Sequence, residues 1–384
     1  AISSAASVPA LILWGNLSDA ISKRKIFVLI GFFGGFASLA MMIFVHTVFQ
    51  FIDILVLFQV LAVASVPVST IMILESNTTE KWAGMISRFS MVSGIGTVLG
   101  TVIGIVFIVM DSSPSNLPYV YVLSSVAYLF SAIIAVFVIK EPSRIISRNW
   151  LSGIHINRIF ERTRYFPTSV IHFVAVPFRS RGERINGNLK FFLFTTAFLM
   201  FGFQMFFVPF PVMVIKFNAS TLDIFIMYML NSVLSTVSFI YAGKIVNRFG
   251  GKTTLFFSLL TRIVIFGLAA LIPVLLFGIS ALVVSIAIYA LLGGVWSVIS
   301  VSQVNYVSKN AGQKARGKAI GWYNSLLGMG QIFGGVASGY VSVIFGYSID
   351  FVISSAIIAI GLGMVIAGYH GETLLKIRNK TNSA

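Results

Sequence analysis

Arg262 is a basic residue inside an apolar run that extends from residue 253 to residue 277. It follows Lys252 by about ten residues, which in a helix is roughly 15 Å along the axis. A guanidinium at that depth could bind an anion through its fork of N–H groups. It could equally extend towards the polar end of the helix, or donate to a backbone carbonyl as a packing element. The residue type alone leaves both alternatives open.

Uncharged polar and aromatic side chains occur at similar depth in other apolar runs, and several phenylalanines crowd residues 198–210. Each one alone is more typical of helix packing or lipid contact than of a binding site. Together they predict an aromatic, weakly polar cavity, which favours a small amphipathic or lipophilic ligand over a highly charged one. Besides Arg262, the candidate path comprises Gln204, Asn231, Trp296, Asn324 and Gln331.

Acidic and metal-binding residues are scarce. All eleven acids lie at or near the ends of apolar runs, Asp350 among them, so no carboxylate is predicted at mid-depth. The chain has no Cys and only four His, none of them in the middle of a run. A membrane-embedded protease or metalloenzyme would need paired acids or His ligands. We therefore expect no catalytic residue, no metal and no cofactor, and the sequence offers no visible proton relay.

Long apolar runs make up most of the 384 residues. The composition is 57% hydrophobic and 10% charged, whereas soluble domains carry about 25% charged residues. Each run has about 20 residues, enough to cross the bilayer core as a helix, and helices are the only consistent structure for such segments. A water-soluble enzyme is excluded. Eleven spans are predicted, at 1–17, 26–46, 52–74, 86–110, 118–139, 190–215, 222–242, 253–277, 279–303, 318–344 and 347–369.

The basic residues determine the predicted orientation. All 27 except Lys216 and Arg262 fall in alternate loops, in the long segment 140–189 or within the first residues of the spans that follow them, which places those regions and the C-terminus in the cytoplasm. The net charge of +16 is then explained without a nucleic-acid partner. Segment 140–189 is either a set of amphipathic helices on the inner leaflet or a solvated basic linker.

Two loops repeat each other. Gly15-Asn16-Leu17-Ser18-Asp19-Ala20-Ile21-Ser22-Lys23-Arg24-Lys25 recurs 228 positions later as Gly243-Lys244-Ile245-Val246-Asn247-Arg248-Phe249-Gly250-Gly251-Lys252. A second pair, around Gly84 and Gly317, is offset by 233 positions. Parallel repeats joined by a long cytoplasmic loop are typical of transporters.

These loops resemble the motif Gly-x-Leu-x-Asp-Arg-x-Gly-Arg-Arg of the major facilitator superfamily. The first copy matches at Gly15, Leu17, Asp19, Lys23 and Arg24, and the second at Gly243, Arg248, Gly250 and Lys252, with Asn247 in place of the acid. The resemblance implies that these residues, with Glu75 as an acidic partner, form a cytoplasmic gate. A positive-inside loop with a capping Asp is the structural alternative.

The resemblance also implies an all-α polytopic membrane protein with the superfamily fold, in which two six-helix bundles are related by pseudo-two-fold symmetry. The repeat frame predicts that the first of twelve helices precedes residue 1. We expect an N-terminal bundle at 1–139, a basic cytoplasmic loop at 140–189, a C-terminal bundle at 190–370 and a cytoplasmic tail at 371–384.

The expected function is secondary transport of a small solute by alternating access in the cell membrane, by a monomer, with a coupling ion left open. Efflux of small lipophilic or amphipathic compounds is the first interpretation. Uptake of a small organic solute, anionic if Arg262 binds it, is the second. A non-transporting membrane protein with the same fold is the third.

Overall fold

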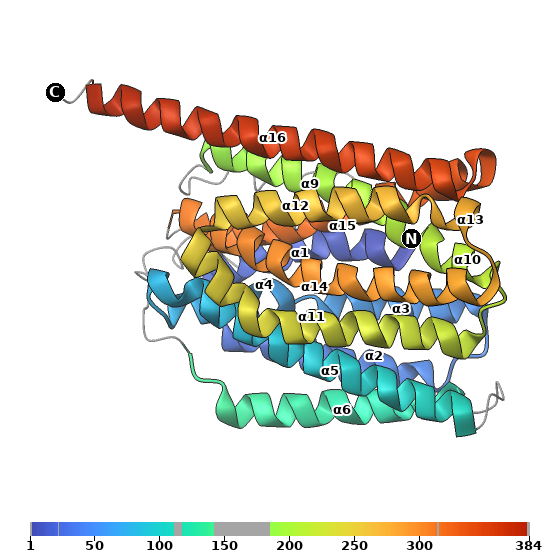
Figure 1. Cartoon of the computed structure of the whole chain (residues 1–384). Helices are drawn as coiled ribbons and strands as arrows, with labels where there is room; N and C mark the ends of the chain where they lie inside the picture. The colour runs from blue at the N-terminus through green and yellow to red at the C-terminus, as the bar shows by residue number, and fades with distance from the viewer. Residues whose placement is uncertain (1, 22, 111–116, 142–184, 313–314, 382–384) are drawn as a thin grey trace. The chain divides into compact units, whose positions relative to one another are not determined.

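The fold was analysed in a computed structural model, which describes residues 2–21, 23–110, 117–141, 185–312 and 315–381 (Figure 1). Every regular element within these ranges is a helix. The α-helices are α1 (Ile2–Ile21), α2 (Lys25–Met42), α3 (Val48–Ala62), α4 (Ser65–Glu75), α5 (Trp82–Met110), α6 (Leu117–Val138), α9 (Gly187–Phe207), α10 (Pro209–Ile215), α11 (Thr221–Phe249), α12 (Gly251–Ala269), α13 (Ile272–Leu275), α14 (Gly278–Asn310), α15 (Arg316–Phe345) and α16 (Tyr347–Thr381), with a short 3-10 helix at Thr79–Lys81.

The prediction of an all-α polytopic membrane protein is confirmed. Among the described residues, ten helical segments are long and apolar enough to cross a membrane. The predicted span 1–17 lies in α1, where the apolar stretch Ala6–Gly15 is shorter than a full span. Each of the other ten predicted spans coincides with one of the ten segments.

Prolines divide three of the predicted spans into two helices each. Pro67 has no N–H for the carbonyl of Val63, and α3 ends at Ala62 while α4 begins at Ser65. Pro209 starts α10 directly after the end of α9, and Pro273 lies in the short α13 after α12. The spans themselves are retained, because each pair of helices continues across the same apolar segment.

The chain forms two compact units. Unit 1 comprises residues 1–78, 113–185 and 311–328, and unit 2 comprises residues 79–112, 186–310 and 329–384. Helix α5 thus groups with the helices of residues 186–310, although it lies within the predicted N-terminal bundle. The helix α16 continues to Thr381 and includes most of the predicted tail. The bundle boundaries at 139 and 190 stay predictions.

Unit 1 is assembled from α1, α2, α3, α4, α6 and the beginning of α15. Helix α2 lies beside α6 and α3, and α1 packs against α3 and α4 (Figure 1). Its core contains the buried Phe27, Val28 and Val68, with Trp14 packed against them. The indole Nε1 of Trp14 donates to the carbonyl of Val60 at 2.8 Å, which joins α1 to α3.

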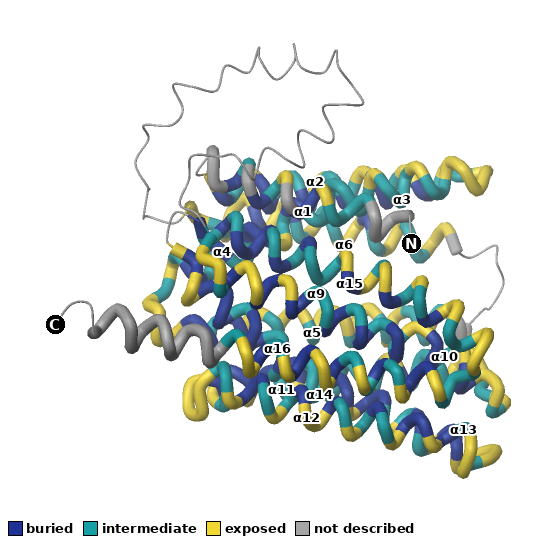
Figure 2. The backbone as a smooth tube through the Cα atoms, turned by 90° about the horizontal axis from the view of Figure 1, so that it is seen from above, coloured by how far each residue is buried: buried dark blue, intermediate teal, exposed yellow. Residues whose placement is uncertain are grey.

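Unit 2 contains the remaining helices. Helix α11 lies between α14 and α5, whereas α16 runs along α9 and α12 (Figure 1). In Figure 2 buried and exposed residues alternate along α12 and α14, so each helix has one face towards its neighbours. The exposed faces are apolar, as at Phe257 (59% exposed) and Leu291 (54%), which is what contact with lipid requires.

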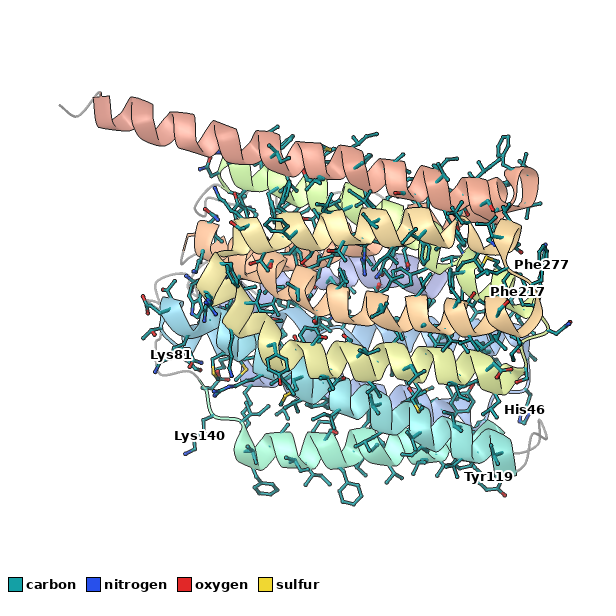
Figure 3. The ribbon with its side chains drawn as sticks, in the orientation of Figure 1. His46, Lys81, Tyr119, Lys140, Phe217 and Phe277 are labelled. Carbon is teal, nitrogen blue, oxygen red and sulfur yellow. The ribbon has the colours of Figure 1, made fainter. Side chains whose placement is uncertain are left out.

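The lysines labelled in Figure 3 lie at the opposite end of their unit from the labelled aromatic residues. In unit 1, Lys140 lies beyond one end of α6 and Tyr119 near the other (Figure 3). In unit 2, Lys81 lies at the end opposite Phe217 and Phe277 (Figure 3). This distribution agrees with the loop alternation that predicts a cytoplasmic side for the lysines.

Candidate functional site

A charged cluster occupies the end of unit 1 where α2 begins. The guanidinium of Arg24 binds the carboxylate of Glu75 at two points, Nη2 to Oε1 at 2.9 Å and Nε to Oε2 at 3.3 Å. Its Nη1 also donates to the hydroxyl of Ser18 at 2.5 Å. Arg24 is 6% exposed, so the pair is largely shielded from water. Glu75 is therefore an ion-pair partner of the first motif copy.

Glu141 fixes the start of α2 by a different contact. Its Oε2 and Oε1 accept the backbone N–H groups of Arg24 and Lys25, each at 2.9 Å. Those N–H groups belong to the first turn of a helix and have no intrahelical acceptor, so a carboxylate there is well placed. The sequence analysis assigned no role to Glu141. The feature of the sequence that could have identified Glu141 is the position of an acid just after an apolar span.

Gly15 lies where α1 and α15 touch. A Cβ at Gly15 would be 3.3 Å from the Cα of Gly321 and 3.4 Å from the carbonyl oxygen of Gly317. Lys23 is exposed, and the side chain of Asp19 lies outside the described residues. The geometry of the first copy is thus a close helix contact beside an ion pair. Its role as a gate stays a prediction.

The second copy reproduces the helix contact of the first. A Cβ at Gly243 would be 2.8 Å from the carbonyl oxygen of Ala83 and 2.9 Å from the Cα of Gly84. Gly84 and Gly317 are the repeat equivalents found in the sequence, so Gly243 with Gly84 corresponds to Gly15 with Gly317. Internal symmetry is therefore visible in the packing as well as in the sequence.

The charged part of the second copy differs. Asn247 and Arg248 are both exposed, and the guanidinium carbon of Arg248 lies 5.3 Å from the ring centre of Phe249. Gly250 joins α11 to α12 with a φ of +81°, a conformation that side-chain-bearing residues rarely adopt. The replacement of the acid by Asn247 thus coincides with an open, solvent-exposed arginine.

Arg262 is enclosed by aromatic rings in unit 2. It is 1% exposed, and its guanidinium carbon lies 4.1 Å from the ring centre of Phe203 and 5.4 Å from that of Phe207. Phe266 and Trp296 are each 5.8 Å away. These four residues, contributed by α9, α12 and α14, are called the aromatic cage below.

The guanidinium in the cage has more donors than partners. Nη2 donates to the carbonyl of Leu292 at 3.3 Å, whereas Nε and Nη1 are buried without a hydrogen-bond partner in the described part of the chain. A buried charged donor without a partner costs several kcal/mol, and a desolvated cation–π contact contributes only about 2 kcal/mol. The described conformation therefore leaves Arg262 with unused capacity for an anion.

The other residues of the candidate path are only partly brought together. Trp296 belongs to the cage, but Nδ2 of Asn231 donates to the carbonyl of Tyr289 at 2.6 Å and joins α11 to α14. Nδ2 of Asn324, in unit 1, donates to the carbonyl of Ile320 in its own helix. Gln204 packs near Gly334, and Gln331 is exposed. Arg262 and Trp296 are thus the core of the candidate site.

Sequence reasoning included Phe203 and Phe207 among the phenylalanines of a predicted aromatic cavity without relating them to Arg262, and it did not identify Phe266. Phe266 follows Arg262 by four residues in α12, a spacing that puts both side chains on one helix face and could have identified it. Phe203 and Phe207 lie in another helix, α9, and no sequence spacing relates them to Arg262. The cage also continues into a larger group of rings. Phe206 stacks on Phe266 with the ring centres 3.8 Å apart, and its ring centre lies 4.7 Å from that of Phe351 of α16.

Comparison with known proteins identifies the family. The chain matches the model of the Major Facilitator Superfamily over residues 1–335. No curated protein matches it. Among solved structures, it is similar to the crystal structure of the human organic anion transporter MFSD10 (TETRAN), with a TM-score of 0.75 and 15% sequence identity, over 95% of this chain and 82% of that one. The chain therefore belongs to the Major Facilitator Superfamily of multi-pass membrane transporters.

Proposed function

We propose that this protein is a secondary transporter that carries a small amphipathic organic anion by alternating access in the cell membrane, with its C-terminus in the cytoplasm. The observation that carries the substrate class is the aromatic cage around Arg262, whose Nε and Nη1 lack partners in the described structure. The anion would be held by these donors while its apolar part contacts the surrounding rings.

The chemistry of the cage favours an anion that also carries an apolar or aromatic group. A guanidinium binds a carboxylate or sulfonate through two parallel N–H bonds, and charge-assisted bonds of this kind are about twice as strong as neutral ones. Rings around the site supply the apolar surface on which most ligand burial depends. A purely polar anion would use Arg262 but gain little from Phe203 and Phe207.

Access to Arg262 requires a movement of its surroundings. Phe203 and Phe266 are buried, whereas Phe207 and Trp296 are only partly buried. Rotation of either partly buried ring would give access to the guanidinium. The described conformation would then be one in which the binding group is closed off, as alternating access requires at one stage of the cycle.

The cluster of Arg24, Glu75 and Glu141 would act as the cytoplasmic gate. A buried charge pair is costly to separate, so it can hold a conformation until substrate binding offsets the cost. The exposed Arg248 of the second copy lacks an acidic neighbour at Asn247. The electrostatic part of the gate would therefore belong to the first copy.

A second candidate is efflux of neutral lipophilic compounds. The specific observation in its favour is the size of the ring cluster, which extends from the cage through Phe206 to Phe210 and Phe351. In that case Arg262 would serve packing through the carbonyl of Leu292 and the ring faces. The two candidates differ in whether the ligand's charge matters.

The test compares benzenesulfonate, a permanently charged aromatic anion, with the neutral benzenesulfonamide of almost the same shape. Thermal unfolding of the purified protein in detergent would be measured with each compound, for the wild type and for Arg262→Gln and Arg262→Lys. A ligand at 100 times its dissociation constant adds about 2.7 kcal/mol to the stability of the folded state. Arg88→Gln, which changes an exposed arginine of α5, is the matched control.

We expect benzenesulfonate to stabilise the wild type and the Arg88→Gln variant, to lose its effect on Arg262→Gln, and to be weakened by Arg262→Lys. Lysine keeps the charge but lacks the bidentate fork. Equal stabilisation by both compounds, unchanged by Arg262→Gln, would support the second candidate. No response from any variant to either compound would argue against both.

A further inference from the structure

Asp350 is a buried carboxylate that the proposed binding site does not use. It lies in the first turn of α16 and is 0% exposed. Both of its oxygens are buried, and neither has a hydrogen-bond partner within the described residues. An ionised carboxylate in this position loses its hydration and gains neither a hydrogen bond nor a counter-ion. Asp350 therefore needs a cation, or access to water, before it can carry a charge.

The sequence supplies one cation on the predicted outer side, where α16 begins. It is Lys216, the one basic residue in a predicted outer loop. On the longer helices packed against α16, Lys190 and Lys252 lie near the predicted inner side and Arg262 lies in the aromatic cage. The helices α10 and α13 carry no charged residue, and the basic residues of α16 itself lie in its last two turns. A side-chain counter-ion for Asp350 would therefore be Lys216.

In the described conformation Lys216 has a different partner. It is the exposed C-cap of α10, and its Nζ lies 4.7 Å from the ring centre of Tyr347. Tyr347 precedes Asp350 by three residues in α16, so the two lie on one helix face with their Cβ atoms about 5 to 6 Å apart. Another acid near this end of unit 2, Asp223, accepts from the N–H and the hydroxyl of Ser220 at 2.8 and 2.7 Å. A short movement would bring the ammonium from the ring to the buried carboxylate.

The backbone directs the two side chains towards each other. Phe206 of α9 packs against Phe351, whereas Lys216, further along the same span, packs against the earlier residue Tyr347. The span Gly187–Ile215 and α16 are therefore antiparallel (Figure 1). Side chains of an α-helix point towards its N-terminus. Lys216 consequently points back along α10, away from the predicted outer side, and Asp350 points towards that side.

The packing of α10 against α16 controls access to Asp350. Helix α10 begins at Pro209, directly after α9 ends at Phe207. Its next residue, Phe210, is 0% exposed, and its ring centre lies 5.7 Å from that of Phe351, the neighbour of Asp350 in sequence. A displacement of α10 from α16 at this level would open the packing beside the carboxylate. The ammonium at the other end of α10 would then reach it.

We propose that Lys216 and Asp350 form an ion pair in a second conformation of unit 2, in which α10 is displaced from α16, and that this pair stabilises the displaced conformation. The inference rests on the proposed function only because alternating access supplies a second conformation. An exposed contact with the ring of Tyr347 is exchanged for a shielded charge pair. As the ammonium arrives, the carboxyl proton passes to the outer solvent, and it returns from there when the pair separates. No proton crosses the membrane in this exchange.

The first experiment tests the contact in the wild-type protein. A carbodiimide joins an amine to a carboxylate in direct contact with it, so the purified protein in detergent would be treated, digested and analysed by mass spectrometry. We expect a peptide in which Lys216 is linked to Asp350, absent from Asp350→Asn. Asp223 is the internal comparison, because it is exposed and lies seven residues from Lys216. Linkage of Lys216 to Asp223 only, or to neither acid, would overturn the proposal.

The second experiment measures the population of the displaced conformation. The chain has no Cys, so Met213→Cys, at a position of α10 that is 1% exposed, provides a single thiol whose labelling rate reports the displacement. We expect Lys216→Gln and Asp350→Asn each to lower this rate about tenfold, which corresponds to about 1.4 kcal/mol. The double substitution should lower it no further, because either change alone removes the pair. Asp223→Asn, the matched control, should leave the rate unchanged.

The outcomes separate this proposal from the proposed function, since neither experiment uses a substrate. Absence of the link would overturn the ion pair and leave the anion transporter standing. A link without any change in labelling would overturn the stabilising role of the pair. If benzenesulfonate does not bind, the anion proposal fails, and the link still decides whether Lys216 reaches Asp350. Should Met213→Cys not fold, the cross-link in the wild type decides alone.

Discussion

We expect Arg24 and Glu75 to be strongly coupled in their effect on stability. Two hydrogen bonds of 2.9 and 3.3 Å connect them, and their side chains are 8% and 16% exposed, so water screens the pair only weakly. A hydrogen bond to a charged group contributes about 1.5 to 3 kcal/mol. Because both bonds use one carboxylate they are not additive, and the expected coupling energy is about 2 to 3 kcal/mol.

A double-mutant cycle would measure this coupling. The variants are Arg24→Gln, Glu75→Gln and the double substitution, each unfolded by a denaturing detergent in mixed micelles and followed by tryptophan fluorescence. The coupling energy is the difference between the double effect and the two single effects. Lys23→Gln combined with Glu75→Gln is the matched control, since Lys23 is exposed and should give a coupling below about 0.5 kcal/mol.

A coupling below about 0.5 kcal/mol for Arg24 with Glu75 would refute the reasoning. It would mean that the pair behaves as a screened surface contact despite its burial. The proposed gate would then lose its electrostatic component, because a contact that contributes so little cannot hold one conformation against another.

The remaining predictions concern single positions. Gly243→Ala should destabilise the protein by about 1 to 3 kcal/mol, because the new Cβ would meet backbone atoms of α5. Gly84→Ala is the control, since the space around its Cβ is open and stability should change little. Equal effects of the two substitutions on thermal unfolding would contradict the packing argument. Glu141→Gln should cost about 1 kcal/mol, since two backbone N–H groups of α2 lose a charged acceptor; an unchanged unfolding midpoint would disprove this. Gly250→Ala should cost about 1 to 3 kcal/mol through strain at φ +81°, again read from unfolding, and a neutral result would show that the connection relaxes. Asp19→Asn, expected from the motif alone, should shift the balance between inward- and outward-open states, and an identical cysteine-accessibility pattern in variant and wild type would count against it.

The architecture could be predicted from the sequence because the lipid environment imposes it. A run of about 20 apolar residues has one stable structure in a bilayer, and the basic loops alternate along the predicted spans, with Lys216 as the one basic residue in an opposite loop. The divisions at Pro67 and Pro209 could not be predicted in the same way. A proline inside a span either kinks a helix or separates two helices, and packing decides which.

The candidate site was predictable only in part. The depth of Arg262 followed from its distance to Lys252, but its cage combines rings from three helices whose relative rotation is a tertiary property. The burial of Asp350 could not be predicted from the sequence either. Its position near the start of a span suggested exposure, whereas the packing of α16 on its neighbours buries it completely. Sequence position gives depth along a helix, and contacts between helices determine the environment.

The separation of α9 from α10 has a mechanical consequence. Pro209 and Pro211 have no N–H, so the carbonyl oxygens of Met205 and Phe207 lose their regular helical donors and the span becomes least stiff at that level. The span Gly187–Ile215 therefore consists of the long helix α9 and the short helix α10, and α10 can tilt relative to α9. Such a tilt would carry Phe210 away from Phe206 while leaving Phe203 in place. Bending at this joint would loosen the ring cluster on the side of Asp350 before it disturbed Arg262.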